Sequence, residues 1–395
     1  MARLIDSLRN SVTLSGPYNN VEPTAIELHK SLFVADLHAD SLLWNRNLLE
    51  KADYGHVDLH RLIEGNISLQ AFTVVTKVPF PSVFGFDTFS QDAPDLITAL
   101  AWLQGRSDGY RQSLKERALE QARMLRRFAK QSAGRTGIDL HIIQWREDLE
   151  EYLLKRRQRI DRGNKPSMVA ALLGLEDAHA LEGDISQSLR ELYEEGFRMM
   201  ALTHFFHNDF GGSSTGHGKQ GLTEKGGELI TEIQRLGIVL DLAHASEKTL
   251  DDLLEMNSLP PLVVSHTGIR KTCPERGAVN LSTDHIKKIA EHGGLIGVGL
   301  WTEAVCGGVS KTVEAIEHVV KTVGDVGSVA IGADFDGGVR THFDARGIAL
   351  LTEELQKKEF SEPEIRKMMG ENVRDFLLKH LRRRADSHSE NNPRG

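Results

Sequence analysis

Short apolar segments alternate with amphipathic stretches from residue 32 onward. Most of the apolar segments are continuous runs, which is the pattern of parallel strands covered on both faces. Eight such strands are predicted, at Leu32–Asp36, Leu69–Val75, Met168–Leu175, Met199–Thr203, Val239–Ala243, Leu262–Ser265, Leu295–Leu300 and Val329–Ala333. The amphipathic stretches predict helices at Ile185–Glu195, Thr223–Leu236, Glu247–Met256, Asp284–His292 and Lys311–Val323. Strands that alternate with helices in this way predict an α/β protein with a TIM-like (β/α)8 barrel, and an open doubly wound sheet is the alternative.

The 395 residues are expected to form a single barrel domain whose core covers about 32–381. A charged helical region at about 95–130 lies in the long gap between the second and third predicted strands, and we expect it to be inserted into the barrel. Residues 1–25 and 385–395 are expected to form peripheral arms.

Composition narrows the class of protein. Hydrophobic residues make up 40% and charged residues 26%, ordinary globular values that argue against disorder and coiled coil. The 48 Lys and Arg against 56 Asp and Glu give a net charge of −8, so no nucleic-acid partner is expected. No apolar run approaches the roughly 18 residues of a membrane span, and neither end resembles a secretory leader or an anchor. We therefore expect a cytoplasmic protein with no membrane anchor.

The sequence contains two cysteines, Cys273 and Cys306, too few for a disulfide framework or a thiolate zinc site. They follow the sixth and seventh predicted strands, so they could be neighbours at the mouth of the barrel. Because the cytosol is reducing, two free thiols are the expectation and a disulfide is the alternative.

Acidic and imidazole side chains stand where the predicted strands end. Six of the eight strands run into such residues, namely His38 with Asp40, Glu176, His204, His244, His266, and Asp334 with Asp336. Because the parallel strands of a barrel end at one rim, where active sites lie, we expect these groups to meet at one mouth. A histidine that is merely hydrogen-bonded at a strand end remains the alternative for each residue taken alone.

The pair His38 and Asp40 is distinguished by its context. Chance predicts about two pairs of the form His-x-acid, and the sequence has five, so the spacing alone identifies no site. Only this pair follows a continuous apolar strand, and the alternation of side chains along a strand places both groups on the same side. Imidazole and carboxylate ligands without thiolate suit zinc, and also manganese, cobalt or iron. Three histidines and two carboxylates exceed the needs of one catalytic zinc and fit two ions about 3.5–4 Å apart.

Ordered motifs along the chain resemble those of the membrane (renal) dipeptidase family, zinc peptidases whose barrel is related to that of the amidohydrolases. The resemblance extends over about 32–381, and it is specific because many motifs occur in order. These motifs include His38-x-Asp40, Leu175-Glu176, Leu202-Thr203-His204, Asp241-Leu242-Ala243-His244, Val264-Ser265-His266, Asp334-Phe335-Asp336-Gly337 and Met369-Gly370-Glu371-Asn372-Val373.

The resemblance implies a role for each metal ligand. His38 and Asp40 would bind one zinc ion, His244 and His266 the other, and Glu176 would bridge the two.

The resemblance also implies the groups that act on the substrate. His204 would contact the carbonyl oxygen, and Asp334 would shuttle the proton. Asp336 is expected to order the turn that contains it, with contact to the substrate as the alternative.

One departure from the family pattern concerns the substrate carboxylate. The family has an arginine before the asparagine that matches Asn280, and in this chain Val279 occupies that position. Arg276 is the candidate that replaces it from a longer loop, and Arg270 is the alternative. Since a guanidinium is the natural bidentate partner of a carboxylate, this change bears on specificity for free dipeptides.

The sequence thus predicts a metal-dependent dipeptidase that cleaves small dipeptides, including those with a D-residue at the second position, by a hydroxide bridging two zinc ions. The alternative is another binuclear amidohydrolase, such as a lactonase, a cyclic amidase or a deaminase. A third hypothesis, a non-catalytic binding or scaffold protein on the same barrel, would predict lost ligands, whereas all five are present. The resemblance further suggests a homodimer.

Overall fold

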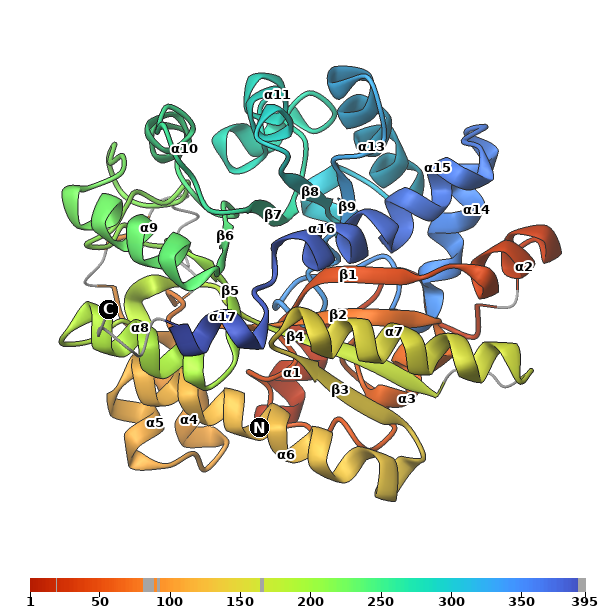
Figure 1. Ribbon diagram of the computed structural model, residues 1–395, viewed down its shortest axis with the longest axis horizontal. Helices are drawn as coiled ribbons and strands as arrows, with labels where there is room; N and C mark the ends of the chain where they lie inside the picture. The colour runs from red at the N-terminus through yellow and green to blue at the C-terminus, as the bar shows by residue number, and fades with distance from the viewer. Residues whose placement is uncertain (19, 81–88, 91–92, 164–166, 390–395) are drawn as a thin grey trace.

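The computed structural model describes residues 1–18, 20–80, 89–90, 93–163 and 167–389. Eight parallel strands form a closed barrel that is surrounded by helices (Figure 1). These strands are β1 (Val34–Ala39), β2 (Ile67–Val74), β4 (Met168–Leu175), β5 (Phe197–Ala201), β6 (Val239–Asp241), β7 (Leu262–Thr267), β8 (Leu295–Val298) and β9 (Val329–Ile331). The ring closes because β1 pairs with β9 and β2 pairs with β4. The predicted (β/α)8 barrel is confirmed, and the open sheet is excluded.

Strand β3 (Asp139–Ile143) lies outside this ring and was not expected from the sequence. It pairs with the first half of β4, up to Leu172, whereas β5 pairs with the same strand from Leu173 onward. The two strands therefore share one edge of β4, since its other edge is taken by β2. The segment reads Asp-Leu-His-Ile-Ile and is only half buried, so it lacks the continuous apolar run that identifies the other strands.

The five helices predicted from the amphipathic pattern are present, and each begins within two residues of its predicted start. Side-chain oxygens of Asp184, Thr223, Ser246 and Ser282 accept hydrogen bonds from backbone N–H groups of the first turns and so fix the starts of four helices. These four are α8 (Ile185–Glu194), α9 (Glu224–Leu236), α10 (Glu247–Leu254) and α11 (Thr283–Glu291). The others in this outer layer are α3 (Leu59–Glu64), α12 (Thr302–Val305), α13 (Val309–Val323), α14 (Ala349–Lys357), α15 (Glu362–Arg366) and α16 (Asn372–His380).

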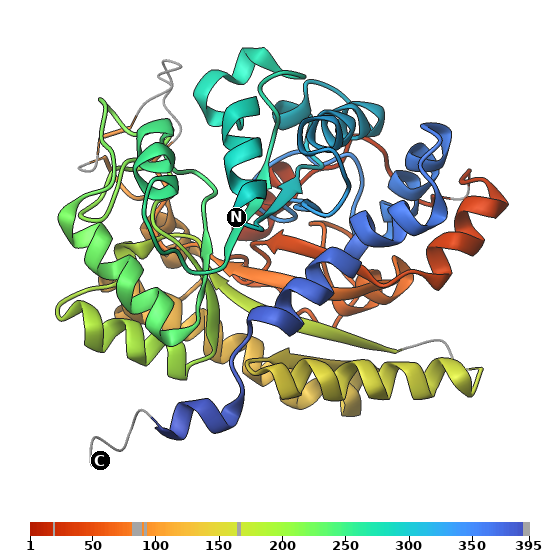
Figure 2. The ribbon, with the colours of Figure 1, turned by 45° about the horizontal axis from the view of Figure 1, so that its top comes forward.

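The inserted helical region between β2 and β4 is also confirmed, and it is longer than predicted. It contains α4 (Leu96–Leu103), α5 (Asp108–Gln112) and α6 (Leu114–Thr136), followed by β3 and α7 (Arg146–Asp161). Helix α7 packs along β3 on the outside of the barrel (Figure 2). Helix α4 lies at the mouth of the barrel instead, where its apolar residues contact the loop that follows β1.

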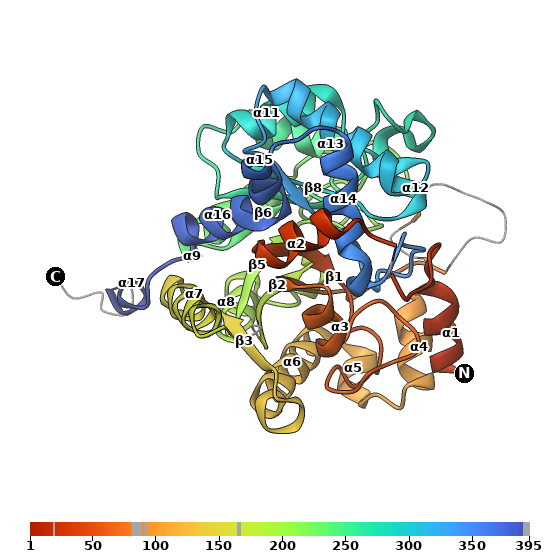
Figure 3. The ribbon, with the colours of Figure 1, turned by 90° about the vertical axis from the view of Figure 1, so that its right-hand side faces the viewer.

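The N-terminal helix α1 (Ala2–Arg9) lies beside α4 (Figure 3). Asp6 forms a buried ion pair with Arg46 at 2.9 Å, and the Asn10 side chain accepts a hydrogen bond from the Gly338 N–H at 2.9 Å. Helix α2 (Pro23–Ser31) packs against α14, and α17 (Arg384–Ser389) follows the last barrel helix. In the described ranges, none of the helices has both the length and the apolar character needed to cross a bilayer.

Candidate metal and catalytic site

The acidic and imidazole side chains predicted from the strand ends lie together at one mouth of the barrel. His38 and His266 belong to the last residues of β1 and β7, and Glu176 directly follows β4. His204 and His244 each lie three residues beyond their strands, β5 and β6. All five side chains are buried or nearly so, which keeps water from competing for them.

Glu176 stands at the centre of this group. Its Oε1 atom lies 3.0 Å from the Nε2 atom of His244 and 3.4 Å from that of His38. The Nε2 atoms of His204 and His266 lie 3.5 and 3.8 Å from the same oxygen. One carboxylate oxygen is thus surrounded by four imidazole nitrogens, which suits a group that bridges cations.

Two more carboxylates complete the cluster on the side of His38. The Oδ1 atom of Asp40 lies 3.4 Å from His38 Nε2, and ligand atoms of His38, Asp40 and Asp334 are all within 4.8 Å of one another. The Thr73 hydroxyl donates a hydrogen bond to Asp40 Oδ1 at 2.5 Å and so orients this carboxylate. Asp334, expected as the proton shuttle, therefore shares a buried site with the proposed ligands.

A single hydroxyl group, that of Ser265, holds two of the histidines. Its oxygen lies 3.0 Å from the Nδ1 atoms of both His38 and His266, and it also hydrogen-bonds the Asp241 carboxylate. If the hydroxyl donates its hydrogen to Asp241, both Nδ1 atoms donate to its oxygen. The Nε2 lone pairs then face Glu176, as metal ligation requires.

The backbone is strained at two residues of the site. His244 has φ 62° and Asp334 has φ 57°, left-handed values that residues other than glycine rarely adopt. Such conformations persist only where the surroundings enforce them, and they cluster at functional sites. No sequence motif predicts these two backbone conformations.

Burial and neighbouring charges shift the protonation of the cluster. Burial alone raises the pKa of Glu176, but His204 and His38 overcome it and hold that pKa well below its ordinary value. Burial alone lowers the pKa of His38, but the carboxylates of Asp40 and Glu176 raise it well above the ordinary value. Burial raises the pKa of Asp334 far above that of a free carboxyl, and repulsion by Asp40 and Glu176 adds to this rise, so Asp334 is able to hold a proton.

The donor set fits divalent metal ions. In the part of the chain that the structure describes, His38 Nε2 and Glu176 Oε2 are buried without a hydrogen-bond partner. Such unpartnered atoms are uncommon inside proteins, and a nitrogen lone pair and a carboxylate oxygen are donors that a bound cation accepts. The groups His38–Glu176–His266 and Glu176–His204–His244 each bring three ligand atoms together, and they share Glu176. Imidazole and carboxylate donors of this kind suit zinc, manganese, cobalt or iron.

Asp336 lies outside this cluster. Its carboxylate is fully buried and forms an ion pair with Arg46 at 2.6 Å. It also accepts hydrogen bonds from the Ser41 hydroxyl and from the His56 N–H, each at 2.6 Å. With these partners, Asp336 connects the turn after β9 to the loop after β1 and, through the Arg46–Asp6 ion pair, to α1.

A cavity of about 460 Å³ adjoins the cluster. Asp40 and His204 belong both to the cluster and to the cavity lining. The other lining residues that the structure describes are mostly apolar. They belong to α1, to α4 and to the loops after β1, β2 and β5. Sequence reasoning did not identify this cavity, because its wall combines segments that are far apart in the chain.

A family model described as membrane dipeptidase (Peptidase family M19) matches residues 23–375. The chain belongs to the membrane dipeptidase family. Among named relatives, Dipeptidase 3 from Macaca fascicularis and Dipeptidase 3 from Homo sapiens are each 27% identical over 223 residues. These alignments cover 53% of this chain and 45% of each relative, so the chain matches less than half the length of these curated relatives.

Solved structures share the fold of this dipeptidase family member. A metallo peptidase from Rhodobacter sphaeroides, liganded with a phosphinate mimic of the dipeptide L-Ala-D-Ala, superposes with a TM-score of 0.66 at 22% identity, over 89% of this chain and 99% of that chain. The probable dipeptidase PvdM from Pseudomonas aeruginosa superposes with a TM-score of 0.67 at 19% identity, over 91% and 98% of the two chains.

The two arginines considered as carboxylate ligands lie away from the cavity of this dipeptidase family member. Arg270 forms an ion pair with Glu247 at 2.7 Å and donates hydrogen bonds to the carbonyl oxygens of Gly277 and Asn280. Arg276 is exposed on a short 3-10 helix, and neither arginine is among the described residues that line the cavity.

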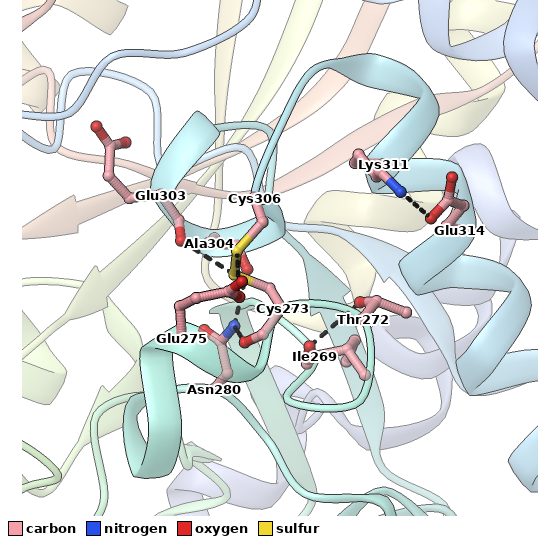
Figure 4. The surroundings of a disulfide bond; sticks show 10 residues. All are labelled: Ile269, Thr272, Cys273, Glu275, Asn280, Glu303, Ala304, Cys306, Lys311 and Glu314. Atoms are coloured by element: carbon pink, nitrogen blue, oxygen red, sulfur yellow. Dashed lines mark hydrogen bonds and ion pairs between the residues drawn. A yellow bond between two sulfur atoms is a disulfide. The ribbon is translucent and has the colours of Figure 1, made fainter.

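Cys273 and Cys306 are joined by a disulfide (Figure 4). The expectation of two free thiols is therefore wrong. The loops after β7 and β8 bring the two Cα atoms within 5.4 Å, a separation that allows the bond. The bond ties the loop that contains Arg276 to α12, beside the mouth of the barrel.

Proposed function

We propose that the chain is a metal-dependent dipeptidase that uses two zinc ions. The observation that carries the proposal is the set of four imidazole nitrogens within 3.8 Å of one Glu176 oxygen, beside a cavity of peptide size. In this proposal His38 and Asp40 would hold one ion, and Glu176 would contribute to holding both. Bound ions at such a site act as Lewis acids and lower the pKa of water.

His244 and His266 would hold the second ion, while two further residues act on the peptide. His204 lies at the border between the cluster and the cavity, where its imidazole can donate a hydrogen bond to the carbonyl oxygen and stabilise the charge that develops there. Asp334, which is buried beside His38 and Asp40, accepts the proton of the attacking water and delivers it to the leaving amine.

Dipeptides with a D-residue at the second position are proposed among the substrates. The family relationship supports a dipeptide, and the relative from Rhodobacter sphaeroides is liganded with a phosphinate mimic of L-Ala-D-Ala. A cytoplasmic location and a homodimer stay predictions from the sequence.

The proposal is tested by a panel of L,L- and L,D-dipeptides, assayed with apo protein, with zinc-loaded protein and after addition of a chelator. We expect hydrolysis that requires the metal. Lactones, cyclic amides and nucleobases belong in the same panel, because turnover of these alone would favour the other amidohydrolase hypothesis. The Asp334→Asn protein, loaded with the same metal, serves as the control for hydrolysis by the metal alone.

A further inference from the structure

The cavity beside the metal cluster has a mostly apolar wall, to which Arg9 contributes a guanidinium group. Its described lining includes Leu43, Trp44, Val75, Ile97, Leu100 and Phe205. Arg9 is the one lysine or arginine among the lining residues that the structure describes. A substrate in this cavity would therefore meet hydrocarbon on most sides and one guanidinium group.

Within the described part of the chain, the Arg9 side chain is unpaired. Across the described ranges, its guanidinium makes no ion pair and no hydrogen bond, whereas Arg3 on the same helix pairs with Asp53 at 2.7 Å. An unpaired guanidinium beside an apolar cavity is available for an anionic ligand, and carboxylates fit its planar donors well.

The position of Arg9 is fixed by buried contacts on either side of it. Asp6, three residues earlier, is paired with Arg46, which is paired in turn with Asp336 at 2.6 Å. Asn10, the next residue, accepts a hydrogen bond from the N–H of Gly338, a residue that also lines the cavity. Helix α1 is therefore attached to the mouth of the barrel through charges that are almost wholly removed from water.

The need for such a cation follows from the arginines that are absent from the cavity. Val279 occupies the position where an arginine was expected from the family resemblance. Arg270 forms an ion pair with Glu247, and Arg276 is not among the described residues that line the cavity. A dipeptide has a terminal carboxylate that must be stabilised when the cavity wall takes it out of water.

We propose that Arg9 binds the terminal carboxylate of the substrate, and that the C-terminal residue of that substrate carries a large apolar side chain. This proposal rests on the proposed dipeptidase function. The side chain would lie against Trp44, Ile97 and Leu100, and the scissile carbonyl would lie beside His204. A residue of the N-terminal helix would thus perform the task that a loop arginine was expected to perform.

Equilibrium binding tests the proposal independently of turnover. Phosphinate mimics of Leu-Leu, with either a free carboxylate or a carboxamide at the C-terminus, are titrated into zinc-loaded protein by calorimetry. Wild type should bind the acid about 10–100-fold more tightly, the range for hydrogen bonds to a charged group. In Arg9→Gln this preference should disappear, and Arg9→Lys should keep part of it. Arg3→Gln, which removes the same charge from the same helix, should behave as wild type.

Three results would overturn the proposal: equal binding of acid and amide by wild type, an unchanged preference in Arg9→Gln, or loss of the preference in Arg276→Gln. A mimic with glycine at the second position should bind less tightly than the Leu-Leu acid, and equal binding would overturn the apolar part. Hydrolysis of Leu-Leu by the same wild-type preparation reports separately on the dipeptidase function. Absence of hydrolysis with the expected binding pattern would refute the function while leaving the role of Arg9 intact.

Discussion

The Nε2 atoms of His244 and His266 lie 2.9 Å apart, and both face the same oxygen of Glu176. Two imidazole nitrogens at this distance cannot both present lone pairs to each other without repulsion, so a proton or a cation must lie at the contact. Burial lowers the pKa of His266 well below its ordinary value, and the neighbouring charges of His38 and His244 lower it further. A metal cation at this place would accept the lone pairs of both rings.

If Glu176 bridges two ions, its removal should cost metal at both positions. We expect Glu176→Ala to retain less than half of the metal that wild type binds, measured by elemental analysis after dialysis. Glu255→Ala, which removes an exposed carboxylate, is the matched control and should keep full occupancy. Full metal content in Glu176→Ala would show that His38, Asp40, His244 and His266 suffice without the bridge.

Asp334 should be needed for turnover and dispensable for metal binding. Asp334→Asn keeps the size of the side chain but cannot accept a proton, so kcat should fall by about 10²–10⁴-fold, the usual contribution of general acid–base catalysis. Metal content measured on the same preparation should match that of wild type. Turnover within threefold of wild type would remove Asp334 from the proton-transfer role, whereas loss of metal would make it a ligand.

The barrel could be read from the sequence because its strands are buried on both faces and therefore leave continuous apolar runs. β3 could not, since it pairs along one half of β4 and remains half exposed. The predicted strands also gave the places of His38, Glu176 and His266. These residues stand at strand ends, and the ends of parallel barrel strands meet at one rim regardless of the length of chain between them. The sequence therefore predicts which side chains lie close together only where the barrel topology brings the strand ends together.

Contacts made by segments outside the strand ends were not predictable. Arg9 precedes the first strand and belongs to no motif, and it reaches the cavity only because the Asp6–Arg46–Asp336 ion pairs attach α1 to the barrel mouth. The disulfide between Cys273 and Cys306 was not expected either. The expectation of free thiols depended on an assumed cytoplasmic location, because the sequence does not give the distance between the two cysteines.

Ser265 should tune metal affinity without touching the metal. Its hydroxyl contacts the Nδ1 atoms of His38 and His266, so Ser265→Ala would leave both rings less firmly oriented. Loss of such a partner typically lowers metal affinity by about 10–100-fold. Competition with a chromophoric chelator measures the change, and Ser265→Thr, which keeps the hydroxyl, should restore most of the affinity. Equal affinity in Ser265→Ala would show that packing alone orients the two rings.

His29 should make the protein sensitive to acid through a site remote from the metal cluster. Its Nε2 atom lies 3.0 Å from the Gly65 carbonyl oxygen, which can only accept, so Nε2 carries the hydrogen and Nδ1 accepts from the Thr352 hydroxyl at 2.8 Å. Both ring nitrogens are thereby used by the neutral form. Burial lowers the pKa of His29 to about 4, although the bond to Gly65 opposes this shift.

Because the folded pKa of His29 lies below the ordinary value of about 6.5, the unfolded chain binds the proton first as the pH falls. The stability contributed by the neutral ring is thus complete above pH 6.5 and is lost progressively down to about pH 4. Between pH 7 and pH 5 we expect a loss of about 2 kcal/mol in the free energy of unfolding from this residue. Urea unfolding of wild type and His29→Gln at both pH values measures it. The variant should be less stable at pH 7, but between pH 7 and pH 5 its free energy of unfolding should fall by about 2 kcal/mol less than that of wild type. Equal falls in the two proteins would assign the acid sensitivity to other groups.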